Sequence, residues 1–376
     1  MTIVFFSNFI NHHNIGFSDY LYDFTSGGFY YVCTHMIPDS YVKSGYPNYF
    51  DRPYVIKAFE DNGFQEAKKL AVQADIAIFG GNQELNQYRI PRLKLDKLSF
   101  ECGERWFKKG WINVFSPQLI ITQFFYHTLF RKCKNYYALN ASAFGVRDYS
   151  ILHSFEGKCF KWGYFTQIKE FDIQSKIFTG SRLMWVNRFI KWKHPEIPII
   201  MAKRLKDEGY TFILDMYGRG ELETKMMALT QKLGVEDCVI FHGSIPNADI
   251  LSEMRSHDIV LTTSDQNEGW GAVVNEAMSN GCVLIGSNKV GAVPFLIEDG
   301  VNGLVFKSNR IESLLVAVKR VIAQPDKCKI LAENAYETIR DVWSPENAAR
   351  NLYKLSLDLL NNKRPSIENG PCSTDE

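Results

Sequence analysis

The sequence lacks the features that mark several common classes of protein. Its eight cysteines are scattered and form no Cys-x-x-Cys pair, which disfavours a zinc site or a disulfide framework and fits a reducing cytoplasm. The formal net charge is only +1, so no global attraction favours nucleic acid. The apolar run at residues 3–6 has no basic residue before it, and no signal peptide is expected.

Familiar catalytic motifs are missing as well. The chain has no Gly-x-Ser-x-Gly, no cysteine in a catalytic context, no P-loop and no strand-preceded Gly-x-Gly-x-x-Gly. A clear Asp-x-Asp element is also absent. These absences disfavour a nucleophilic hydrolase and a dinucleotide enzyme. We expect no metal site and no cofactor.

One stretch has no charged residue over a length that could span a membrane. Residues 110–130 contain no Asp, Glu, Lys or Arg, and two basic residues flank them on each side. Residues that are polar or break helices interrupt the stretch at Asn113, Pro117, Gln118, Gln123 and His127. Because such groups are costly in hydrocarbon, no transmembrane helix is expected. An aromatic, base-flanked surface that touches anionic lipid headgroups remains an alternative to an ordinary buried strand and helix.

What the sequence does contain is an alternation of short apolar runs and helical stretches. A chain of 376 residues that is 45% hydrophobic and 23% charged is globular and long enough for two domains. Strands are expected at residues 3–7, 29–34, 76–79, 183–186, 211–217, 238–242 and 258–264, and helices at 64–73, 195–209, 221–233, 247–256 and 272–280. Repeated strand–helix units predict an α/β fold of two Rossmann-like, doubly wound parallel sheets, one on each side of residues 161–177.

The domain boundaries follow from this pattern. We expect an N-terminal domain at 1–170 and a C-terminal domain at 176–342. A last helix is predicted at 345–360, where Ser344 takes the N-cap position and Pro345 the first helical position. Residues 361–376 are polar and rich in turn formers, which predicts a disordered tail.

The most informative stretch runs from Ser264 to Gly281. A strand, a loop with two glycines and a helix follow one another, the arrangement in which a ligand meets the carboxyl end of a sheet. Glu268 lies in the loop and Glu276 lies about one turn into the helix. The two carboxylates could converge on a polyhydroxylated ligand and leave backbone N–H groups for phosphate. The alternative is an exposed loop acid plus a solvated helix acid.

A basic loop precedes this stretch, directly after the strand at 183–186. Arg188 offers a planar fork of donors for phosphate oxygens, and Lys193 offers a mobile point charge. Lys191 competes with Lys193 for this role. A solvated basic surface is the simpler explanation of such a loop when it is taken alone.

Taken together, these motifs resemble the signature of family 4 retaining glycosyltransferases. The resemblance rests on Glu268 and Glu276 with seven residues between them, on Gly269-Trp270-Gly271, and on Glu-Ala-Met-x-x-Gly. It implies a GT-B fold of two lobes that face a cleft, with the final helix crossing back to the first lobe. It also implies that Glu276 holds the nucleotide ribose and that Glu268 contacts the donor sugar. Arg188 and Lys193, at the family's spacing, would stabilise the leaving diphosphate in place of a metal ion.

Weaker matches extend the resemblance over the rest of the C-terminal domain. They are Gly218 and Gly220 near the nucleotide base, His242 and Gly243 at the end of the next strand, and Gly291 in a following donor-side loop. The departures are Asn187 and His194, where the family has Gly, and Phe295, where it often has Glu. The last of these leaves the identity of the donor sugar open.

The N-terminal domain is less typical of the family. Asn11, His12 and His13 follow the first strand and could hydrogen-bond an acceptor or the departing phosphate, or they could be ordinary loop residues. No metal site is expected there, because the histidines have no helical i, i+4 partner and no nearby Cys. Residues 99–110, with Glu104 and Arg105, and residues 140–144 could also line the cleft.

The resemblance implies retaining transfer of a hexose from a nucleotide diphosphate sugar, which we expect to be UDP-linked. The acceptor would be a glycan or a lipid-linked glycan in surface polysaccharide assembly, and the enzyme would lie in the cytoplasm or at the inner face of the membrane. No nucleic acid partner is expected. Two alternatives are a sugar-nucleotide epimerase and a nucleotide-sugar-binding protein without turnover.

Overall fold

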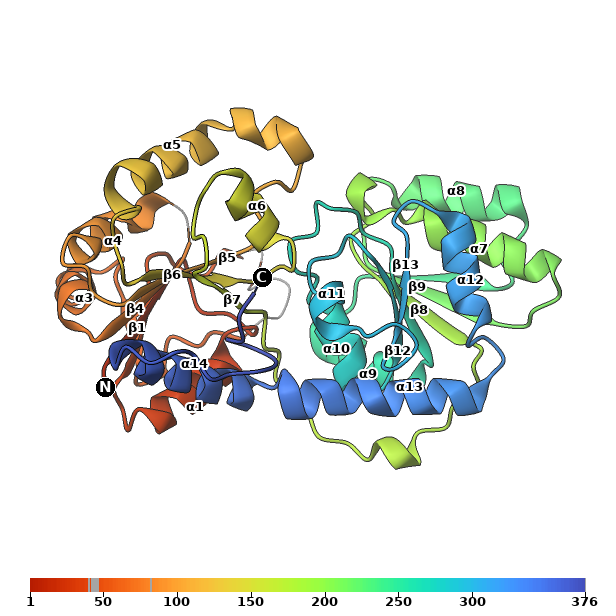
Figure 1. Cartoon of the computed structure of the whole chain (residues 1–376). Coiled ribbons are helices and arrows are strands. Elements are labelled where there is room, and N and C mark those ends of the chain that lie inside the picture. Colours follow the sequence, from red (N-terminus) through yellow and green to blue (C-terminus); the bar gives the residue numbers. More distant parts are fainter. Residues whose placement is uncertain (40, 42–46, 82, 376) are drawn as a thin grey trace. The chain divides into compact units, whose positions relative to one another are not determined.

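The computed structural model describes residues 1–39, 41, 47–81 and 83–375 of the chain. The chain divides into two compact units (Figure 1). Unit 1 comprises Met1–Gln167 and Val342–Glu376, and unit 2 comprises Ile168–Asp341. Each unit is an all-parallel sheet covered by helices on both faces, as the alternation of strands and helices predicts.

Unit 1 contains a seven-stranded sheet in the order β3-β2-β1-β4-β5-β6-β7. Its strands are β1 (Ile3–Ser7), β2 (Phe29–Cys33), β3 (Val55–Lys57), β4 (Ile76–Gly80), β5 (Ser99–Gly103), β6 (Tyr136–Asn140) and β7 (Cys159–Lys161). The central strand β1 pairs with β2 and β4, and its residues Ile3 to Phe6 are buried. Such runs are apolar throughout because both faces of the sheet are covered.

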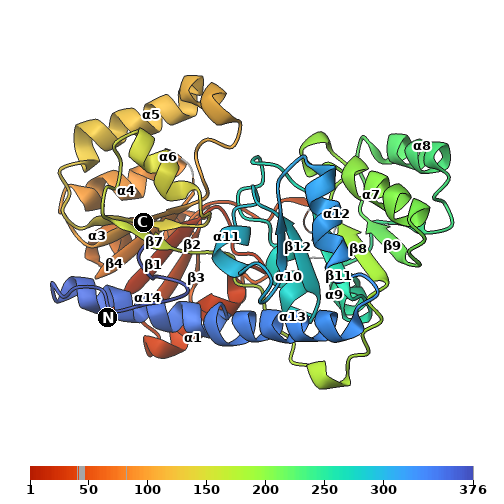
Figure 2. The same ribbon diagram turned by 45° about the vertical axis from the view of Figure 1, so that its right-hand side comes forward.

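The helices of unit 1 lie on both sides of this sheet. They are α1 (Ile15–Phe24), α3 (Asp61–Gln73), α4 (Asn86–Leu93), α5 (Pro117–Phe125), α6 (Gly145–Ile151) and α14 (Pro345–Leu360), with the short turns η1 (Gln83–Leu85), η2 (Gly110–Phe115) and η3 (Tyr126–Phe130). α1 packs beside α14, and α3 packs beside α4 (Figures 1 and 2). Within the described part of the chain, every helix is too short or too polar to cross a bilayer.

The final helix begins as its sequence predicts. The Ser344 hydroxyl accepts a hydrogen bond from the Asn347 N–H at 3.2 Å, and Pro345 occupies the first turn. The buried face of α14 includes Ala348, Leu352 and Leu355. An amphipathic helix therefore anchors Val342–Glu376, the C-terminal part of the chain, in unit 1.

The residues after α14 form an ordered segment, so the prediction of a disordered tail is wrong for residues 361–375. Thr374 forms an antiparallel bridge with Phe160 on the edge strand β7. The Lys161 N–H donates to the Ser373 carbonyl at 2.9 Å, and the Asn140 side chain donates to the Asp375 carboxylate at 2.8 Å. Hydrogen bonds to an open sheet edge hold this polar segment in place, and its composition gives no sign of them.

Unit 2 contains a six-stranded sheet in the order β10-β9-β8-β11-β12-β13. Its strands are β8 (Arg182–Val186), β9 (Ile213–Tyr217), β10 (Val239–Gly243), β11 (Ile259–Thr262), β12 (Val283–Ser287) and β13 (Leu304–Phe306). The strand order reverses between β8 and β11, which pair directly with each other. Ligands of doubly wound folds bind at the carboxyl ends of strands beside such a reversal.

The helices of unit 2 form two layers. They are α7 (Glu196–Asp207), α8 (Glu223–Leu233), α9 (Asn247–Ser256), α10 (Val273–Ser279), α11 (Val293–Leu296), α12 (Ile311–Lys319) and α13 (Pro325–Glu337), with the short turns η4 (Ile173–Ser175), η5 (Lys191–Lys193) and η6 (Thr338–Val342). α7 packs with α8 and α12, whereas α10 packs with α9 and α13 (Figures 1 and 2). The sheet between these layers is buried on both faces, which leaves its carboxyl-terminal edge for ligands.

Candidate functional site

The loops that follow β8 and β11 are joined at the point where the strand order reverses. The Asp265 N–H donates to the Trp192 carbonyl at 3.0 Å. The Thr263 hydroxyl donates to the Lys193 carbonyl at 2.7 Å and accepts a hydrogen bond from the Trp185 indole at 2.9 Å. Because Trp185 is fully buried in the core, these bonds tie both loops to a rigid base.

These two loops bring together a predicted cation and a predicted carboxylate. Lys193 Nζ and Glu268 Oε2 form an ion pair, with their side chains only 10% and 12% exposed. The Ser264 hydroxyl donates to the same carboxylate oxygen at 2.9 Å. Arg188, from the same loop as Lys193, is exposed and lies 6.0 Å from the centre of the Trp192 ring. The loop therefore supplies one exposed cation, Arg188, and one nearly buried, paired cation, Lys193.

His194 stands where the family resemblance predicts a glycine, and its contacts explain how a histidine fits there. Its backbone is left-handed, with φ of 51°, a conformation that Gly adopts most easily. Its ring bonds Glu196 at 2.9 Å and Asp265 at 3.3 Å. The hydrogen bond with Glu196 raises the pKa of His194, against the effect of burial, and Asp265 adds to the rise. The side chain thereby offsets the backbone strain and links the two loops a second time.

Glu276 is held in the first turn of α10. It is buried, and burial raises the pKa of its carboxyl. The Asn247 side chain, at the start of α9, donates to Glu276 Oε1 at 3.1 Å and lowers the pKa in part. Since carboxylate oxygens have further lone pairs, Oε2 keeps capacity to accept from ligand hydroxyls.

Two of the predicted glycines have positive φ and leave no room for a side chain. At Gly218, φ is 127° and a Cβ would lie 1.9 Å from the Asn187 carbonyl oxygen. At Gly271, φ is 93° and a Cβ would lie 2.7 Å from Val290 Cγ1 and 3.3 Å from Glu268 Cγ. Both glycines therefore permit close approach of the loops that carry Arg188 and Glu268.

The remaining predicted donor-side residues lie around these loops. Gly220 follows β9, Gly243 ends β10, and Gly269 and Gly291 are buried. The Gly243 carbonyl accepts from the Gly218 N–H at 2.7 Å, which joins two of the predicted positions. Trp270 is fully buried and its indole donates to Asn275 at 2.8 Å, so its side chain belongs to the core.

His242 belongs to a hydrogen-bonded network that was not predicted; Asp215 and His257 are buried in it, whereas His242 itself is exposed. Asp215 of β9 bonds Nε2 of His242 at 2.5 Å and Nε2 of His257 at 2.9 Å. Burial raises the pKa of Asp215, but the hydrogen bonds with His257 and His242 together outweigh it and the net pKa is lowered. The His242 ring also stacks on Tyr217, with centroids 4.5 Å apart. An acid within a buried strand was the signal that could have revealed this network.

Unit 1 contains a cavity of about 690 Å³ that includes the carboxyl ends of β1, β4 and β5 in its wall. Of the predicted acceptor-side residues, Asn11 and His13 line it. The His13 ring stacks on Tyr164 with centroids 5.1 Å apart and lies tilted against the His12 ring with centroids 3.7 Å apart. Burial lowers the pKa of His12 to about 4, and burial with the neighbouring His12 lowers that of His13 to about 3. Both rings are therefore neutral at physiological pH.

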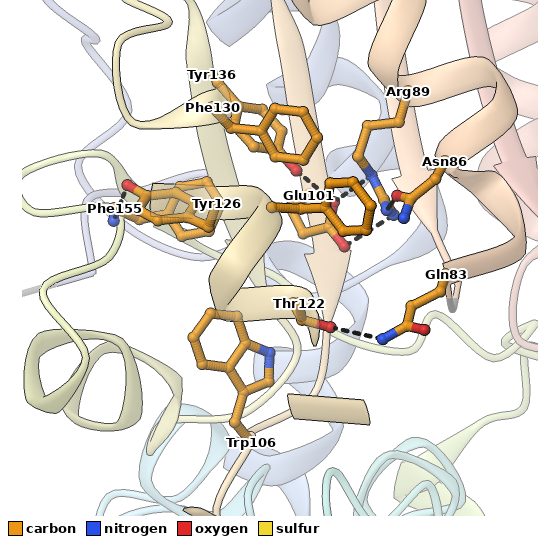
Figure 3. A pocket seen from close by; sticks show the side chains of 11 residues that line it. Gln83, Asn86, Arg89, Glu101, Trp106, Thr122, Tyr126, Phe130, Tyr136 and Phe155 are labelled. Atoms are coloured by element: carbon orange, nitrogen blue, oxygen red, sulfur yellow. Dashed lines mark hydrogen bonds and ion pairs between the residues drawn. The ribbon is translucent and has the colours of Figure 1, made fainter. Parts of the chain in front are cut away.

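Charged residues of the same cavity are paired with one another. Glu101 of β5 pairs with Arg89 and accepts from the Tyr136 hydroxyl at 2.6 Å (Figure 3). Glu104 pairs with Lys108 and accepts from the Tyr164 hydroxyl at 2.6 Å.

A third pair joins Arg105, whose guanidinium donates to the Asp148 carboxylate at 2.9 Å. Glu104 and Arg105 were predicted by name to line the cleft and Glu101 lies within the predicted range 99–110, whereas Arg89 and its pairing with Glu101 were not predicted. No motif surrounds those two residues, and only the fold brings α4 beside β5.

Comparison with known proteins finds similarity to glycosyltransferases within unit 2. Residues 168–338 match the family of glycosyl transferases group 1. An uncharacterized glycosyltransferase of Methanocaldococcus jannaschii is 29% identical over 157 residues, which cover 41% of this chain and 40% of that protein. The amylovoran biosynthesis glycosyltransferase AmsK of Erwinia amylovora is 28% identical over 145 residues, 37% of this chain and 35% of the relative. The chain spans less than half the length of these curated relatives.

Solved structures extend the likeness to both units. A glycosyltransferase from Rickettsia africae has a TM-score of 0.69 at 16% identity, with 96% of this chain and 99% of that one covered. HepE of Anabaena in complex with UDP has a TM-score of 0.66 at 15% identity, with coverage of 94% and 98%. These likenesses confirm the predicted fold class of two parallel-sheet α/β domains, the GT-B type.

Proposed function

We propose that this chain is a retaining glycosyltransferase that moves a hexose from a UDP-sugar to a glycan or lipid-linked acceptor. The observation that carries the proposal is the nearly buried Lys193–Glu268 pair, which shares a loop with Arg188 and lies at the carboxyl ends of adjacent strands. It lies within the residues that match the glycosyl transferase family. The match to AmsK, named for amylovoran biosynthesis, supports a place in surface polysaccharide assembly.

The donor side of the proposal assigns one role to each charged group. Arg188 and Lys193 stabilise the negative charge that develops on the departing diphosphate, without a metal ion. Glu276 accepts hydrogen bonds from the ribose hydroxyls. Glu268, whose position is set by Lys193 and Ser264, orients the sugar beside the reacting carbon. The spacing of the two glutamates resembles the family 4 pattern, and these roles are inferred from that resemblance.

Bond making and breaking occur on one face of the sugar in this proposal. The bond from the anomeric carbon to the phosphate oxygen breaks as a bond to the acceptor oxygen forms, and the acceptor proton passes to the departing phosphate. No enzyme nucleophile is needed, because the positive charge on the sugar is stabilised by the phosphate and by Glu268. The anomeric configuration is thereby retained.

The acceptor side rests on the cavity of unit 1. Among the described residues that line it, the three cations Arg89, Arg105 and Lys108 are each paired with a carboxylate. A described lining without surplus positive charge suits an uncharged, hydroxyl-rich glycosyl unit better than a phosphate. Asn11 and His13 add neutral hydrogen-bonding groups to the same wall. Lipid-linked acceptors imply peripheral contact with a membrane.

The proposal is tested by product analysis with UDP-glucose, UDP-galactose and UDP-N-acetylglucosamine, with and without a panel of soluble and isoprenoid-linked glycosides. We expect UDP release that depends on the acceptor, and a product whose anomeric configuration matches that of the donor by NMR. A new sugar nucleotide formed without acceptor would indicate an epimerase instead. Binding without turnover across the whole panel would indicate a non-catalytic binding protein.

A further inference from the structure

Exposed apolar side chains gather on one segment of unit 1. Of the nineteen large hydrophobic residues exposed in the described chain, six lie between Ile112 and Leu129: Ile112, Phe115, Ile120, Ile121, Phe124 and Leu129. Phe115 is 81% exposed and Leu129, the least exposed of the six, is 42% exposed. They belong to η2, α5 and η3, which we call the α5 segment, residues 110–130. Exposed apolar groups clustered in this way mark an interaction surface.

Along the chain, the charge on either side of the α5 segment is of one sign. From Arg105 to Arg147 the chain has seven basic residues and no acidic one: Arg105, Lys108, Lys109, Arg131, Lys132, Lys134 and Arg147. Four of them, Lys109, Arg131, Lys132 and Lys134, are exposed and lie just outside the two ends of the segment. An uncharged apolar centre with basic ends complements an anionic phospholipid surface, where apolar groups enter the headgroup boundary and cations meet lipid phosphates.

The opposite face of α5 belongs to the cavity. Gln118, Leu119 and Thr122 line the cavity, whereas Ile120, Ile121 and Phe124 are exposed. The two sets are offset by two residues, which is about 200° around an α-helix. The Gln83 side chain donates to the Gln118 carbonyl at 2.8 Å and fixes the inner face to the turn after β4. One helix thus has the cavity on its inner side and the apolar surface on its outer side.

We propose that the α5 segment docks on an anionic phospholipid bilayer, with α5 lying in the plane of the headgroups, and that the cavity beside it takes its acceptor from that surface. The second half of this statement rests on the proposed function; the first half does not. Docking lowers the apparent KM for a lipid-linked acceptor and leaves turnover of a soluble acceptor unchanged.

The test is sedimentation of the full chain with vesicles of phosphatidylglycerol and phosphatidylcholine, and with phosphatidylcholine vesicles alone. We expect binding to the anionic vesicles that weakens with salt. The double variant Ile120→Gln/Phe124→Gln should bind at least tenfold more weakly. The matched control Val316→Gln/Ile330→Gln replaces two exposed apolar residues of α12 and α13 in unit 2 and should bind like the unchanged chain.

Substitution of the flanking bases separates charge from apolar contact. Arg131→Gln/Lys132→Gln should weaken binding to anionic vesicles several-fold and should remove most of its salt dependence. Equal vesicle binding by the unchanged chain and Ile120→Gln/Phe124→Gln would overturn the proposal. The proposal would also be overturned if the unchanged chain did not bind vesicles but formed a concentration-dependent dimer that Ile120→Gln/Phe124→Gln abolished. The surface would then join two copies of the chain.

Failure of docking and failure of the proposed function give different results. Vesicle binding without transfer to any glycoside would refute the function and leave docking in place. Transfer to soluble glycosides by a chain that ignores vesicles would refute docking and leave the function. Thermal unfolding of each variant, compared with the unchanged chain, excludes loss of fold as the cause of weak binding.

Discussion

Lys193 and Glu268 form an ion pair although they lie 75 positions apart in the sequence. Each residue comes from a loop at the carboxyl end of a central strand, and the two strands are neighbours in the sheet. The pair orders both side chains before any ligand arrives, which lowers the entropic cost of binding. In the proposed function, the lysine would also screen the Glu268 carboxylate from the phosphates of the donor.

Removal of the lysine alone should therefore lower the free energy of unfolding. Lys193→Met leaves Glu268 nearly buried without its cation, and we expect the free energy of unfolding to fall by about 3 kcal/mol. Lys193→Met/Glu268→Leu should recover most of this loss, since no unpaired charge remains. Urea denaturation of Lys193→Met, Glu268→Leu and the double variant completes a double-mutant cycle. Additive losses in the double variant would show that the two side chains do not interact.

Gly218 provides a test of the close approach between β9 and the basic loop. Gly218→Ala should lower the free energy of unfolding by about 2 kcal/mol or more, because its Cβ would collide with the Asn187 carbonyl. Gly234→Ala is the matched control, with φ of 64° and no atom within 4 Å of the added Cβ. It should cost about 1 kcal/mol, the strain of left-handed backbone alone. Equal losses for the two variants would show that the contact with Asn187 is unimportant.

The two histidines of unit 1 predict a direction of pH dependence. Their folded pKa values, about 4 and about 3, lie below the value near 6.5 of an unfolded chain. The unfolded state therefore binds more protons below pH 6.5, and stability should fall as the pH is lowered from about 6.5 toward 4. His12→Asn/His13→Asn should reduce this fall. If the double variant and the unchanged chain lost stability equally between pH 6.5 and pH 4 in urea denaturation, the burial of these rings would be contradicted.

Glu104 tests the assignment of the cavity to the acceptor. Glu104→Gln keeps an oxygen for the Tyr164 hydroxyl but removes the charge paired with Lys108. We expect the KM for the acceptor to rise about tenfold, the effect of one hydrogen bond to a charged group, with UDP affinity unchanged. Glu312→Gln, an exposed carboxylate of α12, is the control. A loss of UDP affinity in Glu104→Gln would place this carboxylate on the donor side instead.

The sequence predicted most of the elements of unit 2 because their patterns are local. Asn247–Ser256 begins and ends as expected, and the expected strand at 183–186 becomes Arg182–Val186. Capping at Ser344 was likewise predicted from neighbouring residues. Periodicity and caps are properties of a few consecutive residues, so they can be recognised without knowledge of the fold.

The features that the sequence missed depend on contacts between distant residues. Asp375 is held by Asn140, and Glu101 is paired with Arg89; neither pair lies within a recognisable motif. The same holds for Asp215 and its two histidines. His194 was expected only as a departure from glycine, and its compensating bonds could be identified only once the loops were placed. Tertiary pairing of charges therefore has to be seen in the structure.

The most direct test of the donor site is calorimetric titration of UDP, GDP and ADP into the unchanged chain and into Glu276→Ala. We predict UDP binding that is at least tenfold weaker in the variant, a loss of about 1.4 kcal/mol or more. Because burial raises the pKa of Glu276 and the ribose hydroxyls need its ionised form, UDP affinity in the unchanged chain should also rise with pH as this carboxyl ionises. Failure of all three nucleotides to bind, or equal UDP affinity in Glu276→Ala, would contradict the account.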